Sequence, residues 1–391
     1  MSDISFINEY FRRVRLRILH IINGLAKGGA ERLAIDICRE LDRRNEHDYL
    51  LVSLSPLNEY PELTSSLKLT VENAQIDLKL TGIKSAAISF QKLIRNFQPH
   101  VVHTHLFYAD HAAHLEPLKG IAYFSHIHGP TSQYEQFKLS ALFDKQKLVF
   151  ALTRNHILKK YRGCNHHFIA NSLETQTYLQ RHLPFEKENI IRLDNAIDLK
   201  IFPFITRNFP SRELRLISTG SFVARKNHLF LLHLVKDLSE QDIPVHLTLL
   251  GDGPLRTSLR QQASSLGVTS QVAFAGNVDD VAAQLAKAHV YVHSATYEPF
   301  GLAIVEAMAT GLPVICLDAK GNRGIVDEGI SGFMIESADT KLFAERIKAI
   351  VKDEQTYHSF SISARRKAEQ YDIANYVDNL VGIYLRNLSA R

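Results

Sequence analysis

The stretch Tyr291–Ile315, YVHSATYEPFGLAIVEAMATGLPVI, decides how the second half of the chain folds. A short apolar run ends at small and polar residues, and a run of helix formers, LAIVEAMAT, begins after Gly301. Gly311 and Pro313 end that helix, because glycine readily takes the left-handed conformation that closes a helix and proline cannot continue one. The apolar residues that follow are strand-like. The stretch therefore predicts strand, loop, helix and strand, which is one right-handed crossover unit of a parallel sheet.

Two carboxylates and a helix N-terminus in this unit predict a ligand. Glu298 lies in the loop before the helix, and Glu306 lies inside the helix. The backbone amides of Phe300, Gly301 and Leu302 have no intrahelical acceptor, so they favour an anion, and glycine permits a close approach. Ionised carboxylates accept hydrogen bonds from neighbouring hydroxyls. A nucleotide-sugar, which carries both phosphate and hydroxyls, is the simplest ligand that meets both demands.

Strand-like and helical stretches alternate through the rest of the chain. Gly28 and Gly29 follow the first strand and favour anion binding at the next helix N-terminus, but they do not form the G-x-G-x-x-G of a dinucleotide site. The alternation predicts a doubly wound parallel sheet of the α/β class. The strands expected in the first half are residues 17–22, 50–54, 101–105, 123–129, 168–172 and 190–193, and helices are expected up to residue 41, over 85–97 and over 109–118.

A segment with two prolines, residues 200–212, separates the first alternation from a second. We therefore expect residues 1–202 and 203–372 to form two α/β domains, the second of which contains the opening stretch. An amphipathic helix closes the chain at residues 373–391. Ligands of open α/β sheets bind at the carboxyl ends of the strands, so the edges of the two sheets are the expected binding places.

Composition excludes several classes of protein. The chain has 391 residues, of which 45% are hydrophobic and 22% charged, as in soluble globular proteins. Its three cysteines are scattered and indicate neither a disulfide framework nor a zinc spacing, which favours a reducing compartment. We find no apolar run of membrane-spanning length and no signal peptide, so the expected location is the cytoplasm.

The surplus of positive over negative residues lies in the first half of the chain. Residues 1–200 hold 26 Lys and Arg against 21 Asp and Glu, whereas residues 201–391 hold 20 of each sign. An anionic partner of the first domain and a solvated, slightly basic surface both explain this asymmetry. The segment 1–17 is the most concentrated candidate, either as a helix on an anionic membrane surface or as a leader packed on the domain. Its apolar and basic residues are Phe6, Ile7, Tyr10, Phe11, Arg12, Arg13, Arg15 and Arg17.

The segments EPFGL and EAMATGLPVI resemble the Glu-x7-Glu signature of the retaining family-4 glycosyltransferases, which have the GT-B fold. The segments GLAKGGAERLA, FIANS, GSFVARKNH and LLGDGP also resemble their family counterparts. The resemblance implies two Rossmann-like domains facing across a cleft, with the last helix crossing back to the first domain. It also implies transfer of a sugar from a UDP-sugar, or alternatively a GDP-sugar, to a glycan or lipid-linked acceptor of the cell envelope. No metal, other cofactor or nucleic-acid partner is implied.

The resemblance assigns roles to individual residues. Lys226 corresponds to the family's diphosphate-binding lysine, and Arg225 adds a second cation. Glu298 holds hydroxyls of the donor sugar, and Glu306 holds those of the ribose. Val278 falls in the loop beside the base.

In the first domain, Gly28 and Gly29 leave room for donor and acceptor. His128 matches the histidine that reaches the donor sugar from the acceptor side. The chain departs from the family at Ser221, where an arginine is usual, and at Gly324, where a glutamate is usual.

Two histidine pairs with i, i+2 spacing suggest a rival chemistry. His103 with His105 and His126 with His128 each share one face of a strand and could bind a metal, but no D-x-D and no carboxylate cluster accompanies them. We therefore expect a metal-independent enzyme. The alternatives to glycosyl transfer are a nucleotide-sugar epimerase of similar fold and a nucleotide-sugar binding protein without activity.

Overall fold

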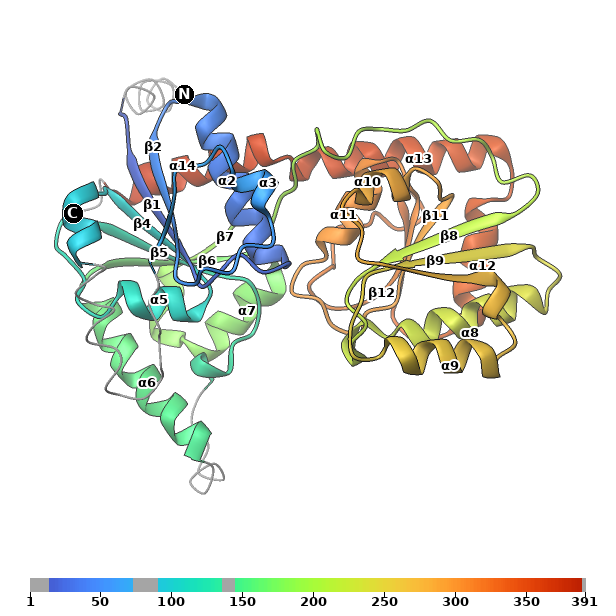
Figure 1. Ribbon diagram of the computed structural model, residues 1–391, viewed down its shortest axis with the longest axis horizontal. Helices are drawn as coiled ribbons and strands as arrows, with labels where there is room; N and C mark the ends of the chain where they lie inside the picture. Colours follow the sequence, from blue (N-terminus) through green and yellow to red (C-terminus); the bar gives the residue numbers. More distant parts are fainter. Residues whose placement is uncertain (1–13, 73–90, 136–144, 389–391) are drawn as a thin grey trace. The chain divides into compact units, whose positions relative to one another are not determined.

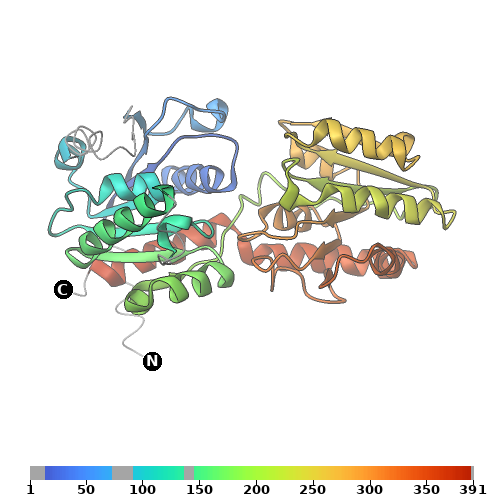
Figure 2. The ribbon, with the colours of Figure 1, turned by 90° about the horizontal axis from the view of Figure 1, so that it is seen from below.

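The structure is a computed structural model that describes residues 14–72, 91–135 and 145–388. The chain divides into two compact units, which are unit 1 (Met1–Asn195 with Ile373–Arg391) and unit 2 (Ala196–Asp372) (Figure 1 and Figure 2). The expected boundary between residues 202 and 203 falls inside unit 2, because Ile197 and Phe202 are buried in the core of that unit.

The described part of unit 1 contains a seven-stranded parallel sheet in the order β3-β2-β1-β4-β5-β6-β7. Short loops and helices connect the strands, as the alternation predicts. The strands are β1 (Arg17–Ile22), β2 (Asp48–Ser53), β3 (Leu69–Val71), β4 (Val101–His105), β5 (Ala122–Ile127), β6 (Asn165–Ala170) and β7 (Ile190–Arg192).

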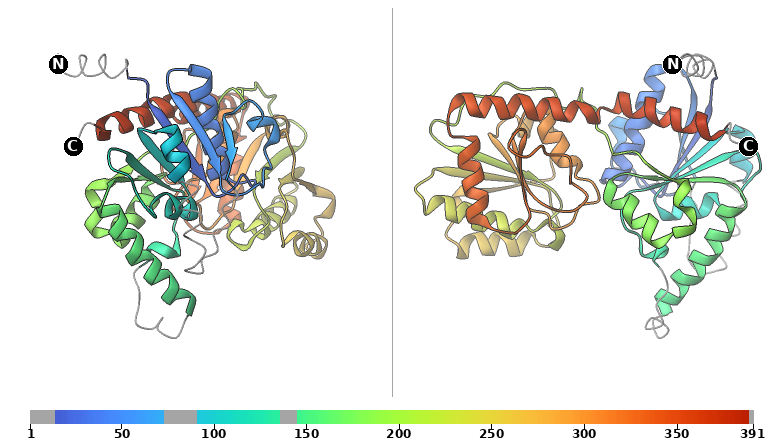
Figure 3. Two further views of the ribbon diagram at one scale, coloured as in Figure 1. Left: turned by 60° about the vertical axis from the view of Figure 1, so that its left-hand side comes forward. Right: turned by 180° about the vertical axis from the view of Figure 1, so that it is seen from behind.

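Helices cover both faces of this sheet. One face packs on α5 (Phe107–Ala113), α6 (Lys145–Arg162) and α7 (Leu173–His182), through an apolar cluster that includes Phe107, Ile157, Phe168 and Leu179. The short α3 (Pro61–Thr64) precedes β3. The other face packs on α2 (Gly29–Arg44) and α14 (Ile373–Leu388), which contact each other (Figure 3). The final helix of the chain is therefore part of unit 1.

Unit 2 contains a six-stranded parallel sheet in the order β10-β9-β8-β11-β12-β13. Two apolar clusters, one on each face, bury the sheet. The strands are β8 (Leu214–Thr219), β9 (Val245–Leu250), β10 (Val272–Gly276), β11 (Val290–His293), β12 (Val314–Leu317) and β13 (Gly332–Ile335). One face packs on α8 (His228–Ser239), α9 (Arg256–Ser265) and α12 (Thr340–Ile350), and the other on α10 (Val281–Leu285), α11 (Leu302–Ala309) and α13 (Glu354–Ala368) (Figure 1).

The opening stretch of the sequence folds as predicted, with β11, α11 and β12 in succession. Gly311 closes α11 at φ +82°, and its amide donates to the carbonyl of Met308 over 2.9 Å. A side chain at Gly311 would also collide with Phe204, since a Cβ would lie 2.6 Å from its ring. The sequence-based expectation of two doubly wound parallel-sheet domains is thus confirmed.

Several element boundaries differ from the expected ones. The helix expected over 109–118 is α5, which ends at Ala113, where the ring Nδ1 of His114 bonds the Asp110 carbonyl at 2.8 Å. The strand expected over 123–129 ends at Ile127, and that over 168–172 ends at Ala170. The expected helix 85–97 lies partly outside the described residues and is helical over 91–97. None of the described helices is both long and apolar enough to cross a bilayer.

Candidate functional site

The backbone around Glu298 is held by the loop that follows β12. The amide of Glu298 donates to the carbonyl of Ala319 over 3.0 Å, and the amide of Gly321 donates to the carbonyl of Glu298 over 3.1 Å. A Cβ on Gly321 would lie 2.1 Å from that carbonyl oxygen, so only glycine fits. The carboxylate is therefore positioned by two loops at the carboxyl ends of β11 and β12.

The side chain of Glu298 is buried among three nitrogen-bearing groups. Its Oε1 receives a hydrogen bond from His293 Nε2 at 2.9 Å and a contact from the ammonium of Lys226. Arg225 Nη1 lies 3.7 Å from Oε2. Only 5% of Glu298 is exposed, so the pairing takes place in a low-dielectric environment.

A chain of hydrogen bonds fixes the proton positions. Burial lowers the pKa of His293, so its ring is neutral and its Nε2–H donates to Glu298. Its Nδ1 then accepts from the hydroxyl of Tyr291 over 3.3 Å. Although burial opposes the charge on Glu298, the bond from His293 and the charge of Lys226 outweigh it and lower the pKa of Glu298 to about 2. Glu298 is thus a carboxylate throughout the physiological range.

The loop after β8 supplies both cations. Arg225 and Lys226 lie in a single turn of 3-10 helix that ends at Asn227, which has a left-handed φ of 50°. The hydroxyl of Ser294 donates to the Lys226 carbonyl over 2.8 Å, and the amide of Thr296 donates to the Arg225 carbonyl over 2.9 Å. The two loops that carry the charged groups are therefore bonded to each other by one side-chain hydroxyl and one backbone amide.

Glu306 lies on α11 and is half-buried. Burial raises the pKa of the Tyr291 hydroxyl, and the charges of Glu306 and Glu298 raise it further. Both carboxylates are therefore within electrostatic range of this one phenol. The structure brings together, at one end of the unit 2 sheet, the two glutamates that the sequence analysis selected.

The first turn of α11 begins at Gly301, whose φ of +118° is left-handed. No side chain among the described residues caps this turn. Phe300 before it is buried, whereas Leu302 is half-buried. Val278, the predicted base-side residue, lies between β10 and α10 and packs on the same apolar cluster as α11.

The remaining predicted residues belong to unit 1. Gly28 precedes α2, and its amide donates to the Tyr60 hydroxyl over 3.1 Å. Gly29 is the first residue of that helix. His128 follows β5, is half-buried, and its Nε2 lies 3.2 Å from Nδ1 of His105. Burial lowers the pKa of His128 to about 3, so its ring is neutral.

One feature of the site agrees with the sequence and another was missed. Gly324, at the position where a glutamate is usual in the family, has a φ of +84° and open space where a side chain would begin. His293 was not selected from the sequence, although it links Tyr291 to Glu298. A buried polar residue at the carboxyl end of a strand, five positions before Glu298, is the signal that could have identified it.

Comparisons with known proteins cover most of the chain. Residues 204–367 match the family model "Glycosyl transferases group 1", and residues 27–201 match "Glycosyltransferase Family 4". Among curated relatives, the poly(glycerol-phosphate) alpha-glucosyltransferase of Bacillus subtilis is 28% identical over 50% of this chain and 29% of its own length. The UDP-Gal:alpha-D-GlcNAc-diphosphoundecaprenol alpha-1,3-galactosyltransferase of Escherichia coli is 25% identical over 79% of this chain and 81% of its own length.

Solved structures agree on the fold. Anabaena Alr3699/HepE, in complex with UDP and glucose, has a TM-score of 0.75 at 20% identity, covering 96% of this chain and 100% of that one. At this identity the likeness establishes the architecture alone, which is two Rossmann-like domains of GT-B type.

Proposed function

The chain belongs to the glycosyltransferases whose group 1 and family 4 models match its two halves, and from this we propose that it transfers a sugar from a nucleotide-diphosphate donor. The donor is a UDP-sugar in preference to a GDP-sugar. The acceptor is a glycan or a lipid-linked sugar of cell-envelope polysaccharide synthesis. Two relatives support this choice of acceptor, since one is named for a glycerol-phosphate polymer and the other for a diphosphoundecaprenol acceptor.

One observation carries the proposal, namely the cluster of the half-buried Lys226 with the buried His293 and Glu298, beside Glu306. In the proposed complex, the ammonium of Lys226 and the fork of Arg225 neutralise the leaving diphosphate. Glu298 accepts hydrogen bonds from hydroxyls of the donor sugar, and Glu306 accepts those of the ribose. Because His293 holds one oxygen of Glu298, the carboxylate is oriented before the donor arrives.

We further propose that the reaction retains the anomeric configuration and needs no metal. The two cations and the first-turn amides of α11 supply the positive charge that a metal would otherwise provide. No protein nucleophile is assigned, and the leaving phosphate takes the acceptor proton. His128 in unit 1 contacts the donor sugar from the acceptor side.

Peripheral contact with an anionic membrane is a further proposal, which rests on the sequence of the first 13 residues. These residues lie outside the described ones. Arg15 and Arg17 are bound to unit 1, since Arg15 forms an ion pair with Asp48 at 2.9 Å and Arg17 Nε donates to the Gln98 carbonyl over 2.6 Å. The proposed contact therefore depends on Arg12 and Arg13 and the apolar residues before them.

A thermal-shift screen of UDP-, GDP- and ADP-sugars tests the proposed function. A ligand at one hundred times its Kd stabilises the native state by about 2.7 kcal/mol, so a cognate donor gives a clear rise in Tm. Stabilisation by UDP-sugars, with release of UDP only when acceptor is added, supports transfer. Interconversion of donor epimers without acceptor would support the epimerase, and no shift with any nucleotide-sugar would reject the proposed donor class.

A further inference from the structure

Five histidines lie on one face of three neighbouring strands in unit 1. His20 is on β1, His103 and His105 are on β4, His126 is on β5, and His128 follows β5. The strand register places His20 opposite His103 and His105 opposite His126. The first four side chains are buried, with 1% or less exposed. The face is the one covered by α14, whose Tyr384 hydroxyl contacts Nδ1 of His103.

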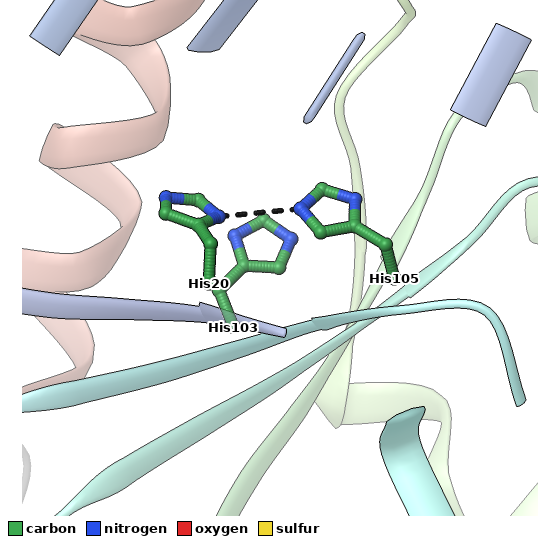
Figure 4. A group of neighbouring side chains, drawn as sticks. All are labelled: His20, His103 and His105. Atoms are coloured by element: carbon green, nitrogen blue, oxygen red, sulfur yellow. Dashed lines mark hydrogen bonds between the residues drawn. The ribbon is translucent and has the colours of Figure 1, made fainter. Parts of the chain in front are cut away.

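Three of these rings converge on one point. His20 Nδ1 lies 3.2 Å from His105 Nε2, and the ring of His103 is 4.9 Å from that of His20 and 4.5 Å from that of His105, between centroids. Figure 4 shows the ring of His103 between the other two. One ring nitrogen from each of the three residues lies within 4.8 Å of the others.

Hydrogen bonding within the described residues leaves this cluster incomplete. A neutral imidazole has one donor and one acceptor nitrogen, and a buried one without partners is unfavourable. Nε2 of His20, Nε2 of His103 and both ring nitrogens of His126 have no hydrogen-bond partner among the described residues. A hydrogen bond between His20 Nδ1 and His105 Nε2 satisfies those two nitrogens, but it leaves Nε2 of His103 without a hydrogen-bond partner among the described residues.

We propose that His20, His103 and His105 bind one divalent transition-metal ion of the zinc class, through one ring nitrogen each. Two nitrogens at 2.0–2.1 Å from a tetrahedral ion lie about 3.3 Å apart, close to the separation between His20 and His105. Imidazole is a ligand for zinc, copper, nickel and iron, whereas magnesium and calcium prefer oxygen. The ion would also satisfy the free Nε2 of His103.

The surroundings prepare the rings for this role. With Nδ1 protonated, His103 donates to the Tyr384 oxygen, and His105 donates to Nε2 of His128. Metal-binding histidines almost always donate their second ring N–H in this way, which fixes the tautomer, and two of the three proposed ligands do so, whereas Nε2 of His20 has no partner among the described residues.

The proposed ligands do not include any of the proposed donor-binding groups, although His128, which we propose to contact the donor sugar, bonds to the ligand His105. The ligands of the ion all lie in unit 1, whereas Lys226, Glu298 and Glu306 lie in unit 2. A second triplet, His105, His126 and His128, overlaps the first through His105. The first triplet is preferred because the bond between His105 and His128 then orients a ligand and is kept when the ion binds.

Zinc titration of the metal-depleted full-length chain against a chromogenic chelator tests the proposal. We expect one zinc per chain, a rise in Tm on zinc addition, and visible absorption of low-coordinate cobalt when Co²⁺ replaces it. His20→Phe and His103→Phe keep an aromatic ring in place but remove a ligand, and each should weaken zinc binding at least about a hundredfold. His358→Phe, at a half-exposed position of unit 2, is the matched control for adventitious histidine binding.

Circular dichroism of each variant without metal verifies that it folds, and His126→Phe discriminates between the two triplets. Retention of zinc by His126→Phe and by His358→Phe, with loss in His20→Phe and His103→Phe, supports the assigned ligands. The proposal is overturned if the wild-type chain binds zinc no more tightly than His20→Phe and His103→Phe. It is also overturned if His126→Phe loses the ion while His20→Phe keeps it.

Discussion

Replacing Glu298 by glutamine removes its charge while keeping its size, and it should lower turnover more than donor affinity. In the wild-type chain Glu298 accepts a bond from His293 and pairs with Lys226. Glutamine can keep its oxygen at the Oε1 position, where it still accepts from His293 and Lys226, but its amide group then faces Arg225 with a donor at the Oε2 position. The variant therefore loses the charged contact to the donor sugar and the negative charge that pairs with Lys226 and Arg225.

The size of the effect follows from the burial of the carboxylate. A hydrogen bond to a charged group contributes about 1.5–3 kcal/mol, which corresponds to a fall in kcat of about 10- to 150-fold. The pKa of Glu298 is held at about 2, against an ordinary value of 4.5, so its charged form stabilises unit 2 by about 3 kcal/mol at neutral pH. Because this pKa is depressed, that stability is present above pH 4.5 and is lost as the pH falls towards 2.

The assay compares Glu298→Gln with Glu306→Gln in steady-state UDP release and in calorimetric titration of the donor. We expect the first variant to reduce kcat and the second to weaken donor binding, because Glu306 is assigned to the ribose. Glu354→Gln, at an exposed position of α13, is the matched control and should leave both quantities unchanged. Wild-type constants in both site variants would refute the assignment of this site.

Three further predictions concern metal, pH and membrane. Turnover should survive EDTA, because Lys226 and Arg225 serve in place of a metal at the diphosphate, and a loss that Mn²⁺ or Mg²⁺ restores would contradict this. Burial disfavours the charge on His114, but Asp110 outweighs it and raises the pKa of His114 to about 10. Because this pKa is raised above that of the unfolded chain, the stabilisation of unit 1 by the pairing is fully present below pH 6.5 and is lost as the pH rises towards 10. The unfolding free energy of the wild-type chain should therefore fall between pH 6.5 and 10, and that of His114→Gln should fall less over the same range. The intact chain should sediment with anionic vesicles at low salt and a chain lacking residues 1–15 should not, whereas equal recovery of both in the supernatant would show that no membrane contact forms.

The sequence predicted the architecture because the relevant signals are local. Gly311 and Pro313 end α11 wherever the helix lies, and the period of the apolar residues distinguishes strands from helices without tertiary information. The short helix α5 was predicted too long because the expected range ran through Pro117, which disfavours helical conformation at the residue before it, whereas the helix ends at Ala113.

The side-chain arrangements that were not predicted depend on strand register and on contacts between residues far apart in the sequence. His20 and His103 are 83 positions apart, and only the pairing of β1 with β4 places them side by side. Gly321 lies in the loop that contains the departure at Gly324, and a glycine is required there because a Cβ would collide with the backbone of Glu298. The place of His293 at the end of a strand marks it as a candidate, but its bonds to Tyr291 and Glu298 need side-chain geometry that no spacing rule supplies.

Isothermal titration of UDP into the wild-type chain and into Lys226→Ala tests the central claim most directly. The claim is that the half-buried Lys226 of unit 2 binds the diphosphate of a nucleotide-sugar. A charge-assisted contact contributes about 1.5–3 kcal/mol, so Lys226→Ala should bind UDP about 10- to 150-fold more weakly. Lys236→Ala, at an exposed lysine of α8, should bind as the wild type does. Equal affinity of Lys226→Ala and the wild type for UDP, or no binding of UDP by either, would contradict the account.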